Sequence, residues 1–229
     1  MHILFTRPET ESIYLAQKFA RLGHQVSIFP ILQVQKKKYS PINFAKYASV
    51  IFTSANAILS LDQVIPSKIR CFCVGEATAQ QAKRKGFSDV VVAGGNYQQL
   101  KEIILQKVNK EDGKLLYVRG EFISHDLEQD LRRESFAVDS IINYTTIPSL
   151  DFDSHILEKL NKKLIDIIFI YSKKSAEHFA KLIFNNNLQG HFSSVRLRCL
   201  SENVLMPLQK IQWNEIKLFS PGNEEFCLD

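Results

Sequence analysis

The feature that most constrains the fold is a regular alternation of short apolar runs with longer amphipathic segments. Segments such as Glu11–Leu22 and Glu76–Lys85 repeat their apolar residues at helical spacing. The short runs between them are mostly apolar, which is typical of parallel strands that helices cover on both faces. The sequence therefore predicts an α/β fold. The expected strands are Ile3–Thr6, Gln25–Phe29, Ser49–Thr53, Arg70–Val74, Asp89–Ala93, Lys114–Val118, Ala137–Tyr144, Asp166–Tyr171, Val195–Leu200 and Glu215–Phe219.

The second half of the chain repeats the first. Ile3–Arg7 aligns without gaps with Leu115–Arg119, at an offset of 112 residues, and both segments end in arginine. Phe52–Ser54 matches Ile170–Ser172, each at the end of a predicted strand. Each repeat has about five strands, enough for one flavodoxin-like sheet. The repeats either fold independently or exchange their first βαβ units, and periodicity does not choose between these arrangements.

Length and composition narrow the class of protein. A chain of 229 residues is long enough for two modest domains. No apolar run approaches the roughly 20 residues of a membrane helix, and the first residues lack the pattern of a secretory signal, so a cytoplasmic protein without a membrane partner is expected. The four cysteines form no C-x-x-C pair and the six histidines show no ligand spacing, which predicts reduced core thiols and no metal.

Small polar and basic residues gather directly after the predicted strands. Ligands of parallel sheets bind at that edge, where helix N-termini expose unpaired N–H groups suited to carboxylates or phosphates. A simpler interpretation is that Ser54, Asn56, Ser172 and Ser175 only cap helices. Arg7 and Arg119 would then pair with Glu9 and Glu121. Recurrence of the pattern in both repeats favours an anion site.

Several familiar sites are excluded by their motifs. The chain has no G-x-x-x-x-G-K-[ST] loop, no G-x-G-x-x-G before the first helix and no G-x-S-x-G elbow. A net charge of +5 favours an anionic partner without specifying one. Lys36–Lys38 is interpreted as a solvated linker, because no aromatic residues interleave with it as in a single-strand binder. RNA binding therefore has little support, and no nucleic-acid partner is expected.

Six segments, in this order and spacing, resemble the uroporphyrinogen-III synthase family over nearly the whole chain. No single one of them is decisive. They are Leu4–Pro8, Ile51–Ala57, Val74–Ala79 with Gly86 and Phe87, Leu116–Gly120, Tyr144–Pro148, and Ile170–Ser172 with Ser175 and Ala176.

The resemblance implies the exchanged arrangement, with two flavodoxin-like domains joined by a two-stranded β connector. Domain 1 would comprise 1–34 and 148–229 and domain 2 would comprise 38–143, with linkers 35–37 and 144–147. It also implies a hydro-lyase of heme biosynthesis that needs no cofactor and is monomeric. Hydroxymethylbilane, a linear tetrapyrrole rich in carboxylates, would be closed to uroporphyrinogen III with its terminal ring inverted and water lost. The alternative is a non-catalytic two-domain module that closes on an anionic small molecule.

The family's binding residues transfer to this chain by motif. The resemblance implies that polar and small residues line a cleft, with three basic side chains supplying charge: Arg7, Thr53, Ser54, Asn56, Gly75, Ala77, Thr78, Arg119, Gly120, Ser172, Lys174, Ser175 and Ser201. The family's proposed acid is a tyrosine, but the expected stretch Ser154–Asp166 contains none. Tyr144 and Tyr171 are the substitutes. A second departure is Val204, where many members have a hydroxyl side chain.

Overall fold

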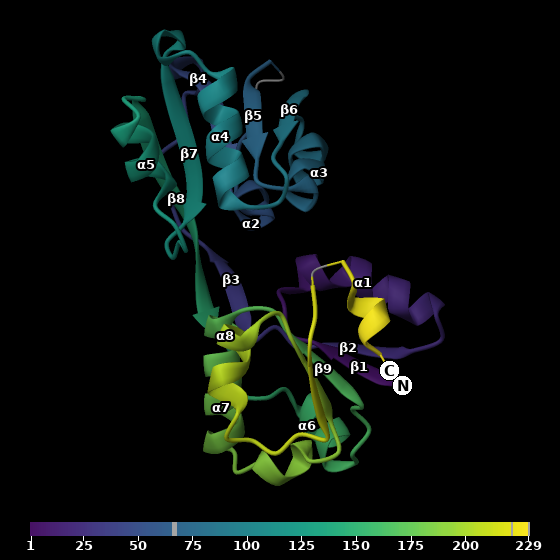
Figure 1. The fold of residues 1–229 in the computed structure, drawn as a ribbon. Coiled ribbons are helices and arrows are strands. Elements are labelled where there is room, and N and C mark those ends of the chain that lie inside the picture. The colour runs from purple at the N-terminus through teal and green to yellow at the C-terminus, as the bar shows by residue number, and fades with distance from the viewer. Residues whose placement is uncertain (66–67, 221, 229) are drawn as a thin grey trace. The chain divides into compact units, whose positions relative to one another are not determined.

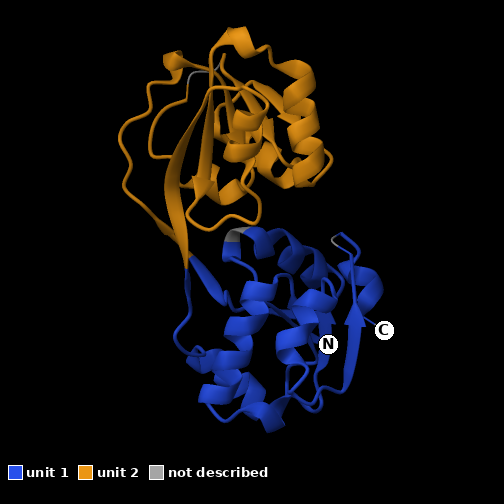
Figure 2. Cartoon of the chain, turned by 60° about the vertical axis from the view of Figure 1, so that its left-hand side comes forward, with its two compact units in different colours: residues 1–33, 147–229 blue, residues 34–146 orange. Residues whose placement is uncertain are grey.

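The chain forms two compact units in the computed structural model, which describes residues 1–65, 68–220 and 222–228. Unit 1 comprises Met1–Gln33 and Ile147–Asp229, and unit 2 comprises Val34–Thr146 (Figure 2). Neither unit is formed by one half of the chain alone.

Unit 1 is built on a five-stranded parallel sheet (Figure 1). The spatial order of its strands is β11 (Glu215–Leu218), β10 (Arg196–Cys199), β9 (Ile167–Ile170), β1 (His2–Phe5) and β2 (Gln25–Ile28). Every residue of β1 and β9 is buried, as expected for apolar strands between two helical layers. Its helices are α1 (Glu9–Arg21), α6 (Ser154–Asn161), α7 (Lys173–Asn185) and α8 (Glu202–Leu205).

Two apolar clusters cover the faces of this sheet. One joins side chains of α6, α7 and α8 to alternate strand residues such as Leu4 and Ile168. The other joins Phe19 of α1, and Phe219 and Leu228 of the C-terminal segment, to the remaining strand residues. The C-terminal segment thus covers sheet surface beside α1, where a further helix would otherwise be needed.

Unit 2 contains a six-stranded sheet with helices α2 (Ala55–Leu59), α3 (Glu76–Lys85), α4 (Tyr97–Lys107) and α5 (Leu127–Arg133). The spatial order of its strands is β3 (Leu32–Lys36), β8 (Val138–Pro148), β7 (Lys114–Gly120), β4 (Tyr47–Phe52), β5 (Arg70–Cys73) and β6 (Asp89–Val92). From β8 to β6 the pairs are parallel. The 3-10 helices of the two units are Phe44–Lys46, Lys110–Asp112, Gln189–Phe192, Met206–Leu208 and Glu224–Cys227.

The two sheets share one topology, which shows how the repeats are combined. In unit 1 the βαβ unit of the first repeat, β1-α1-β2, lies beside β9 of the second repeat. In unit 2 the βαβ unit of the second repeat, β7-α5-β8, lies beside β4 of the first repeat. The repeats have therefore exchanged their first βαβ units. This confirms the fold class expected from the resemblance.

Two strands carry the chain between the units. Lys37 N–H donates to Asn143 O (2.9 Å), and Ser149 N–H donates to Ile31 O (2.8 Å). These two pairings run in opposite directions along the segments, so β3 and β8 are antiparallel. Residues 35–37 and 144–147, which the resemblance implies as linkers, lie in or next to these strands.

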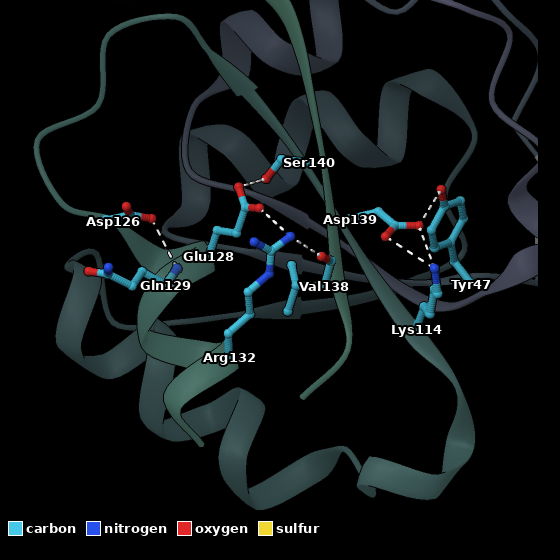
Figure 3. A network of polar contacts seen from close by, with 9 residues as sticks. All are labelled: Tyr47, Lys114, Asp126, Glu128, Gln129, Arg132, Val138, Asp139 and Ser140. Atoms are coloured by element: carbon cyan, nitrogen blue, oxygen red, sulfur yellow. Dashed lines mark hydrogen bonds and ion pairs between the residues drawn. The ribbon is translucent and has the colours of Figure 1, made fainter. Parts of the chain in front are cut away.

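Polar contacts connect α5 to β8, and β8 to its neighbours, at the edge where β4 and β7 of unit 2 begin (Figure 3). Asp139 accepts hydrogen bonds from Tyr47 Oη (3.2 Å) and Lys114 Nζ (3.3 Å), at the first residues of β4 and β7. Arg132 pairs with Glu128 (2.6 Å) and donates to Val138 O (2.8 Å). These groups lie at the amino-terminal edge and serve packing. Their exposed ion pairs contribute little stability.

None of the helices in the described part of the chain has the length and apolar character needed to cross a bilayer. Among the described residues, no three histidine, cysteine, aspartate or glutamate side chains gather as a group that would hold a metal ion. Cys71, Cys73 and Cys199 are buried free thiols, as predicted.

Candidate functional site

Each sheet has one pair of neighbouring strands at which the strand order reverses, so the connections that leave these two strands run in opposite directions. In unit 1 this switch point lies between β1 and β9, and in unit 2 between β7 and β4. Such a switch point leaves a crevice outside the carboxyl ends of the strands, because the following loops diverge. In unit 1, Arg7 comes after β1 and Tyr171 directly follows β9. In unit 2, Arg119 is the last residue but one of β7, and Thr53 directly follows β4. The recurring residues of the two repeats therefore occupy equivalent places.

In unit 1 the switch point brings Arg7 onto Tyr171. The Arg7 guanidinium carbon lies 4.6 Å from the centroid of the Tyr171 ring, within the range of a cation–π contact. Arg7 Nε also donates to Glu11 Oε2 (2.8 Å). The expectation of an ion pair with Glu9 is wrong, because Arg7, which precedes α1, pairs with Glu11 in the first turn of that helix.

Residues of the C-terminal segment also contact Tyr171. Its ring packs edge-on against Phe219 (5.1 Å between centroids), and its hydroxyl donates to Glu224 Oε1 (3.4 Å). Burial and the neighbouring Glu224 carboxylate raise the pKa of Tyr171 above its ordinary value. The phenol therefore keeps its proton throughout the neutral range.

The serines of α7 act as caps. Ser172 accepts a hydrogen bond from Ser175 N–H (3.1 Å), and the two hydroxyls are 2.8 Å apart. Half-buried Lys174 lies in the same first turn. Ser201 begins the four-residue helix α8 without a side-chain capping bond. The capping interpretation thus holds for Ser172, while its position at the carboxyl edge is also the one expected of a site residue.

Replacing Ser172 by alanine should lower the free energy of unfolding by about 1 kcal/mol, because α7 loses its N-cap. Urea denaturation, followed through Trp213 in the core of the same unit, measures the change. Ser193→Ala is the matched control, since the Ser193 hydroxyl only donates to a nearby carbonyl at an exposed site and should have little effect. Equal midpoints for the wild type and Ser172→Ala would contradict the capping role.

In unit 2 the switch point brings together Thr53, Tyr117 and Arg119. Thr53 Oγ1 and Tyr117 Oη are 2.9 Å apart. Tyr117 is 1% exposed, and burial raises the pKa of its phenol. Arg119 Nη1 donates to Gly120 O (3.1 Å), but the buried Arg119 Nε has no partner among the described residues. Glu121, the acid expected to pair with Arg119, forms an ion pair with Lys37 (2.6 Å).

Tyr144 comes to this edge from β8, which neighbours β7. A Cβ added to Gly120 would lie 2.6 Å from Tyr144 Cζ, so any larger residue at position 120 would force the ring to move. Tyr144 is 9% exposed. The structure therefore places this expected residue next to Arg119 and Gly120, in a fixed position.

The other expected residues of unit 2 lie at the starts of α2 and α3. Ser54 accepts a hydrogen bond from Asn56 N–H (3.2 Å), and the Asn56 side chain is buried. Gly75 begins the ten-residue helix α3 without a side-chain cap, which leaves the first N–H groups, including that of exposed Ala77, without intrahelical partners. Thr78 is buried in the same turn.

Two residues of these clusters were not singled out from the sequence. Tyr117 lies within a segment that carries the family resemblance, but its strand pattern indicates only a core position. Glu224 is far from Tyr171 in the chain and does not directly follow a strand, because β11 ends at Leu218. The local sequence does not single it out, because Glu224 and Glu225 stand side by side in a segment with other polar residues.

The fold and the two edges define a class of protein: paired flavodoxin-like sheets with exchanged βαβ units, each with a basic side chain and open N–H groups at its switch point. A model of the family described as uroporphyrinogen-III synthase HemD matches residues 14–217. The chain therefore belongs to the uroporphyrinogen-III synthase family.

Individual relatives agree with this assignment. The putative uroporphyrinogen-III synthase of Methanocaldococcus jannaschii is 27% identical over 126 residues, which cover 51% of this chain and 52% of the relative. The match thus spans about half the length of that curated relative. The crystal structure of uroporphyrinogen-III synthetase from Helicobacter pylori aligns over 99% of this chain and 98% of its own, with 16% identity and a TM-score of 0.62. At that identity the alignment supports the fold.

Proposed function

We propose that the chain is a hydro-lyase of heme biosynthesis that closes hydroxymethylbilane to uroporphyrinogen III, with inversion of the terminal pyrrole ring and loss of water. Family membership supports this proposal. The observation that carries it is Arg119, a half-buried arginine at the switch point of unit 2 whose Nε has no partner among the described residues. A guanidinium placed there is suited to a carboxylate.

The substrate's carboxylates would be bound by the edges described above. In unit 1 the donors are Arg7, Lys174 and the N–H groups at the start of α7. In unit 2 they are Arg119 and the N–H groups after Ser54 and Gly75, supported by Thr53 and Thr78. Helix N-termini and arginines both favour anions, so a polycarboxylate meets matching charge at each edge. We take the two units as the domains that the resemblance implies.

The reactive atoms belong to the substrate, so the chain contributes mainly by positioning. When the terminal C–O bond breaks, its electron pair leaves with the hydroxyl, which takes up a proton and departs as water. The terminal ring then attacks through its substituted carbon, and the resulting spiro intermediate fragments and recloses. Well-oriented intramolecular closure lowers a barrier by about 7–11 kcal/mol. A positioned acid adds about 10²–10⁴-fold.

Tyr144 is our candidate for that acid. It lies beside Gly120 and Arg119 at the edge where substrate would bind. Tyr171, the other tyrosine expected from the resemblance, already donates its proton to Glu224. The proposal further includes a cytoplasmic, monomeric enzyme without a cofactor, a membrane partner or a nucleic-acid partner.

The composition of the product tests the proposed activity. The purified chain should convert freshly prepared hydroxymethylbilane to the type III isomer, whereas a reaction without protein yields the spontaneous type I isomer. Chromatographic separation of the oxidised isomers measures the ratio. Formation of type I alone would overturn the proposal. Tight binding without turnover would instead support the non-catalytic anion-binding module.

Arg119→Ala should raise the KM for hydroxymethylbilane by about tenfold, because neighbouring N–H donors replace part of the lost charge-assisted bond. Arg119→Lys should recover part of the loss, since it keeps the charge without the planar fork. Arg133→Ala, which removes a largely exposed arginine of α5, is the control and should leave KM unchanged. Initial rates over a range of substrate concentrations measure all three. An unchanged KM in Arg119→Ala would exclude Arg119 as a carboxylate ligand.

A further inference from the structure

Glu224 is a buried carboxylate in an unusual setting. It is 3% exposed, yet its Oε2 has no hydrogen-bond partner among the described residues. Within the described part of the chain, its Oε1 accepts a hydrogen bond from the hydroxyl of Tyr171 (3.4 Å). Burying a carboxylate without full hydrogen bonding is costly, so such a group is seldom retained for packing alone. Glu224 also lies at the switch point of unit 1, next to proposed binding residues.

The ionic groups around Glu224 are paired with one another. Arg7 pairs with Glu11 on α1, and Lys18 of the same helix pairs with Glu225 (2.8 Å). These are the charged groups that face Glu224 and Tyr171 from α1, from the turn after β1 and from the C-terminal 3-10 helix. Among these described groups, the Glu224 carboxylate is the one that accepts the Tyr171 hydroxyl, so its charge lies next to the phenol.

The direction of the Tyr171 hydroxyl follows from the same contact. Because Glu224 is an acceptor, the phenol directs its proton inward and presents oxygen lone pairs on its other side. The ring itself is fixed by Phe219 and by the Arg7 guanidinium. Tyr171 therefore offers a hydrogen-bond acceptor to a ligand at the carboxyl edge, and a negative charge lies behind it.

We propose that Glu224 is a positioning residue that turns Tyr171 into an acceptor for a pyrrole N–H, and that the pair stabilises the positive charge on the substrate ring when water leaves. This inference rests on the proposed synthase function. Heterolysis of the terminal C–O bond leaves the ring as an azafulvenium cation, whose charge is shared with its N–H. The departing hydroxyl takes up a proton from the acid proposed above, and rearomatisation after ring closure releases one. Neither Tyr171 nor Glu224 changes its protonation state.

The matched variants are Glu224→Gln, which keeps the shape and removes the charge, and Glu225→Gln, which changes the next residue at an exposed ion pair. Tyr171→Phe and the double variant Tyr171→Phe/Glu224→Gln complete a cycle. Glu224→Gln should lower kcat about tenfold or more while KM changes less than about twofold, because the charge is needed only as the cation develops. The double variant should be no slower than Tyr171→Phe, since Glu224 acts through Tyr171. Glu225→Gln should match the wild type.

A second readout does not depend on activity. In protein labelled with ¹³Cζ-tyrosine, the resonance of Tyr171 is assigned by its loss in Tyr171→Phe and is followed during a pH titration. The phenol pKa should be lower in Glu224→Gln than in the wild type, because the carboxylate that opposes ionisation is gone, and unchanged in Glu225→Gln.

Failure of the proposed synthase activity can be distinguished from failure of the proposed Glu224 role. If the wild type forms no type III isomer, the proposed function fails, while the titration still tests the Glu224–Tyr171 contact. If the wild type is active but Glu224→Gln keeps its kcat, or if Tyr171→Phe and Glu224→Gln lower kcat additively, the inference is overturned. An unchanged Tyr171 titration in Glu224→Gln would overturn it as well.

Discussion

Arg198→Ala should lower the free energy of unfolding by about 3 kcal/mol or more, through the loss of a large buried side chain and its charge-assisted hydrogen bonds. Arg198 is fully buried and pairs with Glu215 Oε2 (2.7 Å). Its Nε donates to Cys227 O, so it also fixes the C-terminal segment onto the sheet. The single tryptophan, Trp213, lies in the core of unit 1, so its fluorescence during urea denaturation reports the effect.

Arg196→Ala is the matched control on the same strand. Arg196 is half-buried and also holds the C-terminal segment, with Nη1 donating to Leu228 O (2.6 Å). Its loss should cost only about 1 kcal/mol, because water replaces the bond at a partly open site. A smaller effect in Arg198→Ala than in Arg196→Ala would show that the buried arginine does not anchor this segment.

Gly120→Ala should lower both stability and turnover, because the added methyl group displaces Tyr144. The added Cβ would lie 2.6 Å from Tyr144 Cζ and 2.8 Å from its hydroxyl, so the ring has to move from a position where it is almost fully buried. Overpacking of this kind costs about 1–3 kcal/mol. Displacing the proposed acid should also lower kcat about 10²-fold or more.

Two further variants separate the steric effect from the chemical one. Gly120→Ala/Tyr144→Ala should recover stability, because the space is restored, but not activity. Gly190→Ala should behave as the wild type, since nothing lies within 4 Å of a Cβ at that position. Full activity in Gly120→Ala would show that the position of Tyr144 is unimportant.

The fold was largely predictable because its strands are apolar on both faces. All ten predicted strands are present, with ends within two residues except at β8, which extends four residues further than predicted. The strand that was missed, β3, alternates apolar and polar residues and pairs only with β8, so it lacks the apolar signal. The exchange of βαβ units was not predictable from periodicity, because independent and exchanged repeats have the same strand pattern.

The site was predictable in position but not in its contacts. A parallel sheet brings the ends of its strands to one edge, so residues such as Arg7 and Thr53 were expected there. Which acid pairs with Arg7 depends on how the first turn of α1 directs its side chains, and the partner is Glu11. Glu224 reaches Tyr171 only because the C-terminal segment folds back over the sheet. Such long-range contacts leave no pattern in the local sequence.

Amide NMR can test whether the carboxyl edges of the sheets bind the tetrapyrrole. ¹⁵N-labelled protein is titrated with uroporphyrinogen III kept under reducing conditions. We expect the largest shift changes at the switch points and the following helix starts, including Thr53, Arg119 and Ser172. Changes confined to the opposite edge of unit 2, around Lys114 and Asp139, or to Lys36–Lys38, would contradict it.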